Sequence, residues 1–251
     1  MMNDWLEDLR TAVAFLTRLP MPHPQGAMPP NFVRAHRMFP LVGGAIGGAV
    51  GLVCLALRAI GLPDLAAAAL ALGASALLTG ALHEDGLADV ADGFGGGRDL
   101  AAKLEIMRDS RLGTYGALIL MVSFVAKLSA LAALPDGVVV QGLIAAQALA
   151  RGVLPLMAMS LVYARKDGLA ANAGRPDSAT ASTAAGIAVL IGFVALPWRD
   201  ALGAALMASA CAIGMAWLAQ RQIGGQTGDV LGGAEQLGET AILLLLAARF
   251  G

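Results

Sequence analysis

Long apolar stretches with almost no charged residues constrain the fold of this chain more than any other feature. A transmembrane helix needs about 20 consecutive, predominantly apolar residues. Seven stretches approach or exceed that length, and the last is short: residues 39–62, 65–82, 113–134, 138–163, 181–198, 201–220 and 237–250. The sequence therefore predicts an all-α, polytopic membrane helix bundle with about seven transmembrane helices.

Composition agrees with a lipid environment. Hydrophobic residues make up 57% of the chain and charged residues 14%, whereas charged residues form about a quarter of a typical soluble domain. Because seven spans and their connections use nearly all 251 residues, we predict one integral membrane domain over residues 1–251 that has the lipid bilayer as a partner. A net charge of −1 argues against nucleic acid as a partner, since phosphate binding requires excess Lys and Arg.

Residues 1–38 form an amphipathic N-terminal segment ahead of the transmembrane bundle at 39–251. Residues 4–18 carry apolar side chains at helical spacing with acids and arginines between them, which predicts a helix at the membrane interface. Pro20, Pro22 and Pro24 are expected to end this helix. The first residues lack a basic stretch followed by a short apolar core, so they do not resemble a cleaved signal peptide.

Lys and Arg are unevenly distributed between the two ends of the predicted spans. Twelve fall on the side of the N-terminus and the segments 84–112, 164–180 and 221–235, and three (Arg58, Arg199 and Arg249) fall on the other. The positive-inside rule places the richer side in the cytoplasm. We therefore predict a multi-pass protein of the cytoplasmic (inner) membrane, with active-site loops 84–112 and 221–235 facing the cytoplasm.

Four carboxylates gather in nine residues where the second apolar stretch ends: Glu84, Asp85, Asp89 and Asp92. On a helix the three aspartates fall on one stripe and repel one another unless a cation lies among them. Carboxylates near substrate phosphates are typical Mg²⁺ ligands, so we predict that these four residues bind Mg²⁺. The alternative is a solvated acidic helix end. The adjacent His83 has no second His or Cys at ligand spacing, so we expect it at most to support a ligand.

A basic segment follows the acidic cluster. Arg supplies paired hydrogen-bond donors to phosphate oxygens and Lys supplies a mobile charge, so these residues are candidates for binding an anionic substrate. The alternative is ordinary positive-inside flanking of the next span. The candidate substrate-binding residues are Arg98, Lys103, Arg108, Ser110 and Arg111.

Two charged residues, Lys127 and Arg151, lie within predicted spans. A charge at membrane depth is costly and points to function. Lys127 lies in the outer part of its span, where it could extend to the membrane surface. We expect Arg151, near the middle of its span, to line a polar cavity and to contact either a substrate phosphate or a buried carboxylate.

The segment before the last apolar stretch, residues 224–239, is Gly-rich and acidic. Gly225 allows backbone N–H groups to approach a phosphate closely, so we expect it to bind substrate. Asp229 is a candidate to complete the metal site or to act as a base. It can instead be the N-cap of the final helix.

Three motifs carry a resemblance to a known family. They are His-Glu-Asp-Gly-Leu-Ala-Asp-x-x-Asp-Gly at 83–93, Lys-Leu-Glu-Ile-Met-x-Asp-Ser-Arg-x-Gly-Thr-Tyr-Gly at 103–116 and Gly-Gly-x-Thr-Gly-Asp at 224–229. Together with Thr-Arg-Leu-Pro at 17–20 and Phe-Pro-Leu-Val-Gly at 39–43, they resemble the cobalamin 5'-phosphate synthase family over nearly the whole chain.

This resemblance implies a magnesium-dependent transferase that joins adenosylcobinamide-GDP to α-ribazole or α-ribazole 5'-phosphate and releases GMP at the end of coenzyme B12 assembly. In that reaction one carboxylate accepts the proton of the attacking hydroxyl, and Asp92 and Asp229 are our catalytic candidates. The sequence leaves the oligomeric state open, a homo-oligomer included.

Two alternatives have different chemistry. Asp89-Val-Ala-Asp92-Gly93 is similar to the opening of the CDP-alcohol phosphotransferase motif, although the remainder of that motif is absent in register. In a small-molecule transporter, Lys127 and Arg151 would line the pathway, but the acidic residues stop at one predicted face of the membrane.

Overall fold

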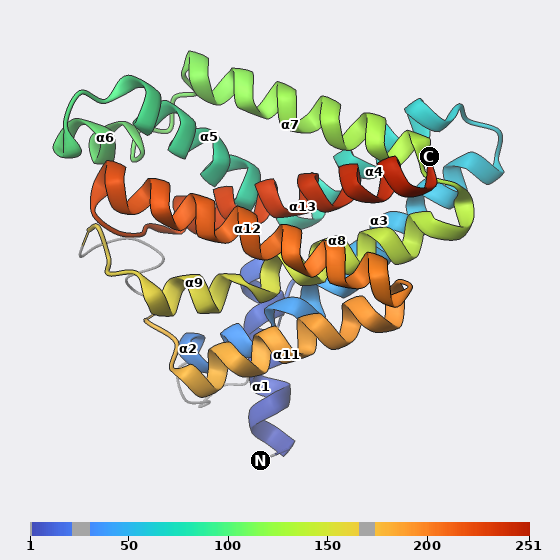
Figure 1. The fold of residues 1–251 in the computed structure, drawn as a ribbon, viewed down its shortest axis with the longest axis horizontal. Coiled ribbons are helices and arrows are strands. Elements are labelled where there is room, and N and C mark those ends of the chain that lie inside the picture. Colours follow the sequence, from blue (N-terminus) through green and yellow to red (C-terminus); the bar gives the residue numbers. More distant parts are fainter. Residues whose placement is uncertain (1, 22–30, 166–173) are drawn as a thin grey trace.

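A computed structural model describes residues 2–21, 31–165 and 174–251. The helices, shown in Figure 1, are α1 (Met2–Leu16), α2 (Phe32–Ala35), the 3₁₀ helix η1 (His36–Met38), α3 (Phe39–Ala59), α4 (Asp64–Thr79), α5 (Leu82–Gly96), α6 (Leu100–Ile106), α7 (Thr114–Ala133), α8 (Asp136–Gly152), α9 (Leu154–Ser160), α11 (Ser178–Ala195), α12 (Trp198–Ile223) and α13 (Gly228–Phe250). Pro22 and Pro24, expected to end the first helix, lie outside the described residues. So do residues 166–173 of the predicted cytoplasmic segment 164–180.

The predicted all-α membrane bundle is confirmed. Among the described residues, six helices are long and apolar enough to cross a membrane, or seven if one bent pair is counted as a span. That pair is α4 and α5, whose axes meet at 91°. Gly80 and Ala81, both with left-handed backbone angles, form the bend. The second predicted span, 65–82, is therefore not a continuous transmembrane helix.

Two further predictions of local structure are wrong. Segment 84–112, named as a loop, forms most of α5 and all of α6, and of the two descriptions only the helical stripe of Asp85, Asp89 and Asp92 agrees with the structure. Segment 221–235, also predicted as a loop, contains the end of α12 and the first two turns of α13. The last helix thus begins at Gly228, nine residues before the apolar stretch from which we predicted it, because Gly and acidic residues lower the hydropathy of its first turns.

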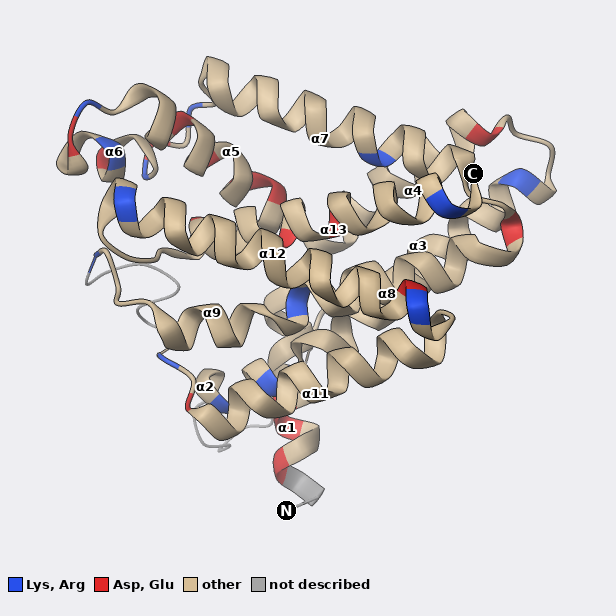
Figure 2. Cartoon of the chain, viewed as in Figure 1, with Lys and Arg blue, Asp and Glu red and all other residues tan. Residues whose placement is uncertain are grey.

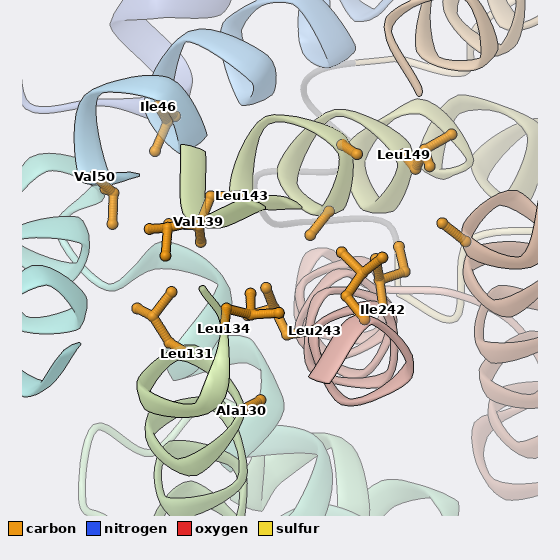
Figure 3. Close-up of a cluster of buried hydrophobic side chains, with 14 of the residues drawn as sticks. Ile46, Val50, Ala130, Leu131, Leu134, Val139, Leu143, Leu149, Ile242 and Leu243 are labelled. Carbon is orange, nitrogen blue, oxygen red and sulfur yellow. The ribbon is translucent and has the colours of Figure 1, made fainter. Parts of the chain in front are cut away.

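Close packing between α3 and α8 forms the centre of the bundle. A Cβ atom on Gly43, Gly47 or Gly51 would overlap the backbone of α8, so these glycines, one helical turn apart, permit direct contact between the two helices. The hydrophobic core continues across α7 and α13, where Leu131 and Leu243 are buried (Figure 3). The glycines of the first span therefore serve helix packing.

Many of the charged residues lie toward the two ends of the bundle, and a few lie between them (Figure 2). At the end of the bundle where α3 ends and α8 begins, Arg58 contacts Asp136 at 2.8 Å, and Arg249 near the end of α13 contacts Asp200 near the start of α12 at 3.5 Å. At the opposite end, α5, α6 and the start of α13 hold the acidic and basic motifs. Arg58, Arg199 and Arg249, the three arginines on the side with fewer Lys and Arg, are therefore at the end of the bundle opposite these motifs.

The N-terminal helix is fixed to the start of the first long span. Asp8 is almost completely buried and accepts a hydrogen bond from Arg34 Nε at 2.9 Å, while Arg37 lies 2.7 Å from its second oxygen. Arg37 also stacks over the Trp5 ring at 3.8 Å. These contacts hold α1 against α2 and η1, and its placement at a membrane interface stays a prediction.

Candidate active site

The crossing of α5 and α13 brings the acidic motif together with the Gly-rich motif. A Cβ atom on Gly86 would lie 3.0 Å from the Cα atom of Asp229 and 3.3 Å from that of Gly232. Any larger residue at position 86 would therefore push the two helices apart. Glycine at this position sets Asp85 and Asp89 beside the first turn of α13.

A cavity of about 130 Å³ opens at this crossing. One part of its wall consists of aromatic side chains from α1, η1 and α3, namely Phe15, His36 and Phe39. The polar part of the wall holds two acids, a base and a histidine: Asp85, Asp229, Arg165 and His83. The cavity thus combines aromatic side chains with charged groups that match a phosphorylated ligand.

Asp229 lies at the start of α13 among oriented polar groups. Arg165 donates to its Oδ2 atom at 3.2 Å, and the Thr227 hydroxyl lies 3.1 Å from the same oxygen. Thr227 accepts from the backbone N–H of Val230 and is the N-cap of α13. The alternative that Asp229 caps this helix is therefore wrong, and its carboxylate remains available to the cavity.

The three aspartates of α5 differ in their surroundings. Asp85 lines the cavity. Asp89 is repelled by the charges of Asp85, Asp92 and Asp229 and attracted by Arg165. Asp92 is buried, and its two oxygens accept the backbone N–H groups of Gly113 at 2.8 Å and Gly116 at 2.9 Å.

These contacts give Asp92 an anchoring role. The first N–H groups of a helix have no partner within that helix, and Asp92 satisfies two such groups at the start of α7. Of the two catalytic candidates, Asp229 lines the cavity and Asp92 does not. The catalytic assignment of each residue stays a prediction.

Glu84, the fourth predicted metal ligand, faces away from this site. Its carboxylate lies 4.0 Å from Lys127 Nζ. Lys127 in turn donates to Gln236 at 2.7 Å and lies 3.5 Å from Glu239. The suggestion that Lys127 extends to the membrane surface is therefore wrong, because its side chain is 6% exposed and is paired inside the bundle.

Arg151 is the centre of a second buried set of contacts. It pairs with Glu235 and with the side chain of Gln147. The other Glu235 oxygen lies 3.1 Å from His83 Nδ1. Of the two partners expected for Arg151, the structure contains the protein carboxylate, and its predicted contact with substrate stays a prediction.

Sequence reasoning missed Glu235 and Glu239 as buried partners of these cations. Glu235 was assigned to the loop 221–235 and Glu239 only to the Gly-rich, acidic segment 224–239, but both lie in α13 and are buried. The available signal was their spacing of four residues, which places both on one helical face. Arg165 was also missed as a cavity residue, since it was considered only in the charge count.

Besides Arg151, which does not line this cavity, six predicted substrate-binding residues do not line it either. Four of them are exposed around α6: Arg98, Arg108, Ser110 and Arg111. Arg111 bonds Asp109, and these hydrogen bonds lower the pKa of the Asp109 carboxyl to about 2. Lys103 donates to Gln222 at 2.5 Å, which joins α6 to α12.

Gly225, the sixth of these residues, packs against the protein's own backbone. A Cβ atom on it would overlap the carbonyl of Val162. The neighbouring Gln226 donates from its backbone N–H to the same carbonyl at 2.8 Å. Gly225 therefore permits the close approach of residues 162–164, which directly precede Arg165.

Comparisons with known proteins identify the family of this chain. A family model described as cobalamin-5-phosphate synthase matches residues 8–247. An adenosylcobinamide-GDP ribazoletransferase of Bradyrhizobium diazoefficiens is 46% identical over 97% of this chain and 94% of its own length. One from Azorhizobium caulinodans is 43% identical over 97% of each chain. No solved structure matches the chain.

Proposed function

The chain belongs to the cobalamin-5-phosphate synthase family, and from this premise we propose that it is an adenosylcobinamide-GDP ribazoletransferase. It joins adenosylcobinamide-GDP to α-ribazole or α-ribazole 5'-phosphate and releases GMP. The observation that carries this proposal is the meeting of Asp85, Asp229 and Arg165 at one cavity. Such a site holds groups of both signs where a diphosphate has to be bound and cleaved.

We propose Mg²⁺ as the cofactor, and the residues present fit it. The mutual repulsion of Asp85, Asp89 and Asp229 is opposed by Arg165, so the acidic side of the site favours a further cation. Within the described residues, no three His, Cys, Asp or Glu side chains are grouped tightly enough to enclose a metal by themselves. Mg²⁺ commonly binds through one or two carboxylates together with water and substrate phosphates, which matches an open acidic site.

Asp85, Asp89 and Asp229 are the residues that would hold this ion. When bound, Mg²⁺ neutralises the charge that develops on the phosphate oxygens during phosphoryl transfer. Glu84, although predicted as a ligand, is directed toward Lys127 and is not included in this proposed set.

The reaction requires alignment and one proton acceptor. A ribose hydroxyl that α-ribazole and its 5'-phosphate share forms a bond from its oxygen to the phosphorus attached to cobinamide, the bond from that phosphorus to the GMP oxygen breaks, and the hydroxyl proton passes to a carboxylate. Asp229 is the proposed acceptor because it lines the cavity. Arg165, 3.2 Å from Asp229, is positioned to bind a phosphate oxygen and to orient that carboxylate.

We also propose that the site faces the cytoplasm from the inner membrane, with the bilayer around the apolar helices. The support is the concentration of Lys and Arg at the end of the bundle that holds the site. The transporter alternative loses its main support, because Lys127 and Arg151 are paired with Glu239 and Glu235. The CDP-alcohol transferase alternative predicts CMP as the released nucleotide.

Nucleotide release by the purified protein tests the proposal. Adenosylcobinamide-GDP and α-ribazole with Mg²⁺ should yield GMP and a cobalamin product in equal amounts, and chelation by EDTA should stop both. Excess Mg²⁺ should restore them. If neither α-ribazole nor its 5'-phosphate supports GMP release, the proposed function is wrong. Turnover in the presence of EDTA would exclude Mg²⁺ as the cofactor and leave the proposed reaction unchanged.

A further inference from the structure

The cavity has an aromatic wall that the phosphate chemistry does not use. Three rings belong to it: Phe15 from α1, His36 from η1 and Phe39 at the start of α3. Phe15 and Phe39 are nearly parallel with their centroids 5.8 Å apart, and His36 stacks on Phe39 at 4.6 Å. The three rings thus stack on one another where they line the cavity.

Aromatic residues are scarce in this chain, which makes their concentration here informative. Of seven Phe residues, Phe15 and Phe39 line the cavity and a third, Phe32, packs edge-on against Phe15. A lipid-facing surface can be built from aliphatic side chains, and most of the hydrophobic residues of this chain are aliphatic. Rings gathered at a polar cavity instead favour stacking with a flat ligand.

The wall is held in place by contacts that do not involve the acidic site. The Asp8 carboxylate binds both Arg34 and Arg37, which fixes α1, and with it Phe15, against the start of the first span. His36 Nδ1 is bonded to the carbonyl of Phe32 at 2.7 Å, which sets the plane of the imidazole. The surface is therefore formed before a ligand arrives.

We propose that this wall, made by Phe15, His36 and Phe39, binds the benzimidazole base of the ribazole acceptor, an inference that rests on the proposed function. α-Ribazole is a ribonucleoside whose base is a fused aromatic ring with methyl groups on its outer edge. Stacking on phenyl rings suits such a base. Its ribose then extends toward Asp85 and Asp229, which line the same cavity.

The alternative occupant is the guanine of adenosylcobinamide-GDP, and the chemistry of the wall disfavours it. The edge of guanine carries several hydrogen-bond donors and acceptors. The phenyl rings provide no partners for them, and His36 Nδ1 is already bonded. Buried polar groups without partners are costly, so an apolar-edged base is favoured. A cavity of about 130 Å³ is also well below the roughly 300 Å³ of a pocket for a drug-sized ligand, so it accommodates one ring system and not an entire cobinamide nucleotide.

Substitution of the two phenylalanines, with a matched control, tests the subsite. Phe15→Leu and Phe39→Leu remove the ring and keep an apolar side chain. Phe124→Leu makes the same change on the exposed surface of α7. In detergent, equilibrium dialysis measures the binding of α-ribazole alone, and steady-state kinetics give KM for each substrate.

We expect each cavity substitution to weaken α-ribazole binding by about tenfold, the effect of losing one base-stacking surface. For the two cavity variants, KM for adenosylcobinamide-GDP should stay within about twofold of the value of the unmodified protein. For Phe124→Leu, the affinity for α-ribazole should also stay within about twofold of that value. Guanosine should not displace bound α-ribazole. If Phe39→Leu reduces thermal stability, the test rests on α-ribazole binding by Phe15→Leu, because Phe15 is only half-buried.

The outcomes separate this inference from the proposed function. Unchanged α-ribazole binding in Phe15→Leu, or an increase confined to KM for adenosylcobinamide-GDP, would overturn the subsite while GMP release by the unmodified protein still supports the function. Absence of GMP release by a protein that binds α-ribazole through these rings would overturn the function and support the subsite. An unmodified protein that does not bind α-ribazole at all would overturn the subsite.

Discussion

Arg151 of α8 and Glu235 of α13 form an ion pair inside the bundle, with 2% and 0% of their side chains exposed. The same glutamate contacts His83 of α5 at 3.1 Å, so three helices meet at one carboxylate. His83 lines the cavity. The pair therefore connects the packing of the membrane helices to the position of a residue in the candidate active site.

Replacing Arg151 by Met should destabilise the fold. Removal of one partner from a buried ion pair leaves an uncompensated charge and typically costs about 3–5 kcal/mol. Arg249→Met is the matched control, because Arg249 lies 3.5 Å from Asp200 with 64% of its side chain exposed, and such pairs contribute about 1 kcal/mol or less. Denaturation in detergent measures both. A stable Arg151→Met protein with weakened substrate binding would show instead that the substrate is the principal partner.

Lys127 and Glu239 should show strong energetic coupling. Their charged atoms are 3.5 Å apart in the interior, so Lys127→Met should destabilise the protein more than the double variant Lys127→Met/Glu239→Gln. Coupling between contacting residues is about 0.5–3 kcal/mol, and we expect the upper part of this range for buried charges. A double-mutant cycle by thermal denaturation checks this. Additive effects of the two changes would mean that Glu239 is stabilised by groups other than Lys127.

Asp85→Asn, Asp89→Asn and Asp229→Asn should each lower turnover by at least about 100-fold, equal to roughly 2.7 kcal/mol of transition-state stabilisation. Stability should change little, because relief of carboxylate repulsion offsets the lost contacts. Asp136→Asn, at the far end of the bundle with 71% of its side chain exposed, is the control and should be fully active. Near-normal turnover at limiting Mg²⁺ in any of the three would exclude that residue from the proposed metal site.

Asp92→Asn should behave differently from those three variants. An Asn side chain can accept one of the two N–H groups at the start of α7, but its NH₂ group faces the other. The resulting unsatisfied donor costs about 1–3 kcal/mol, so we expect lower thermal stability together with lower activity. Unchanged stability with loss of turnover would instead support the direct catalytic role expected from the sequence.

Cysteine labelling in intact cells should establish the orientation. In a protein without Cys54 and Cys211, Gly96→Cys at the end of α5 should be protected from an impermeant thiol reagent added from the periplasm. Gly137→Cys at the opposite end should react. Position 137 has open space around a new side chain, and at position 96 a Cβ atom makes an ordinary contact with Ile106. The reverse pattern of labelling would invert the proposed topology.

The sequence alone determined that the chain is a membrane helix bundle and which residues form the acidic motif. A span must be apolar over about 20 residues, so hydropathy located the spans, and the Lys and Arg distribution grouped the polar segments at one end. Helical spacing placed Asp85, Asp89 and Asp92 on one stripe. These are local or averaged properties, and they do not depend on which helices are neighbours.

Only the tertiary structure decided which of the polar residues form the site. Hydropathy averages over a window and hid the first turns of α13, where Glu235 and Glu239 meet cations from α7 and α8. Asp92 belongs to the acidic stripe by sequence. In the structure it accepts the backbone N–H groups of Gly113 and Gly116 and so anchors the start of α7. Partners separated by 20 to more than 100 residues are selected by helix packing, and glycine contacts such as Gly86 against Asp229 determine that packing.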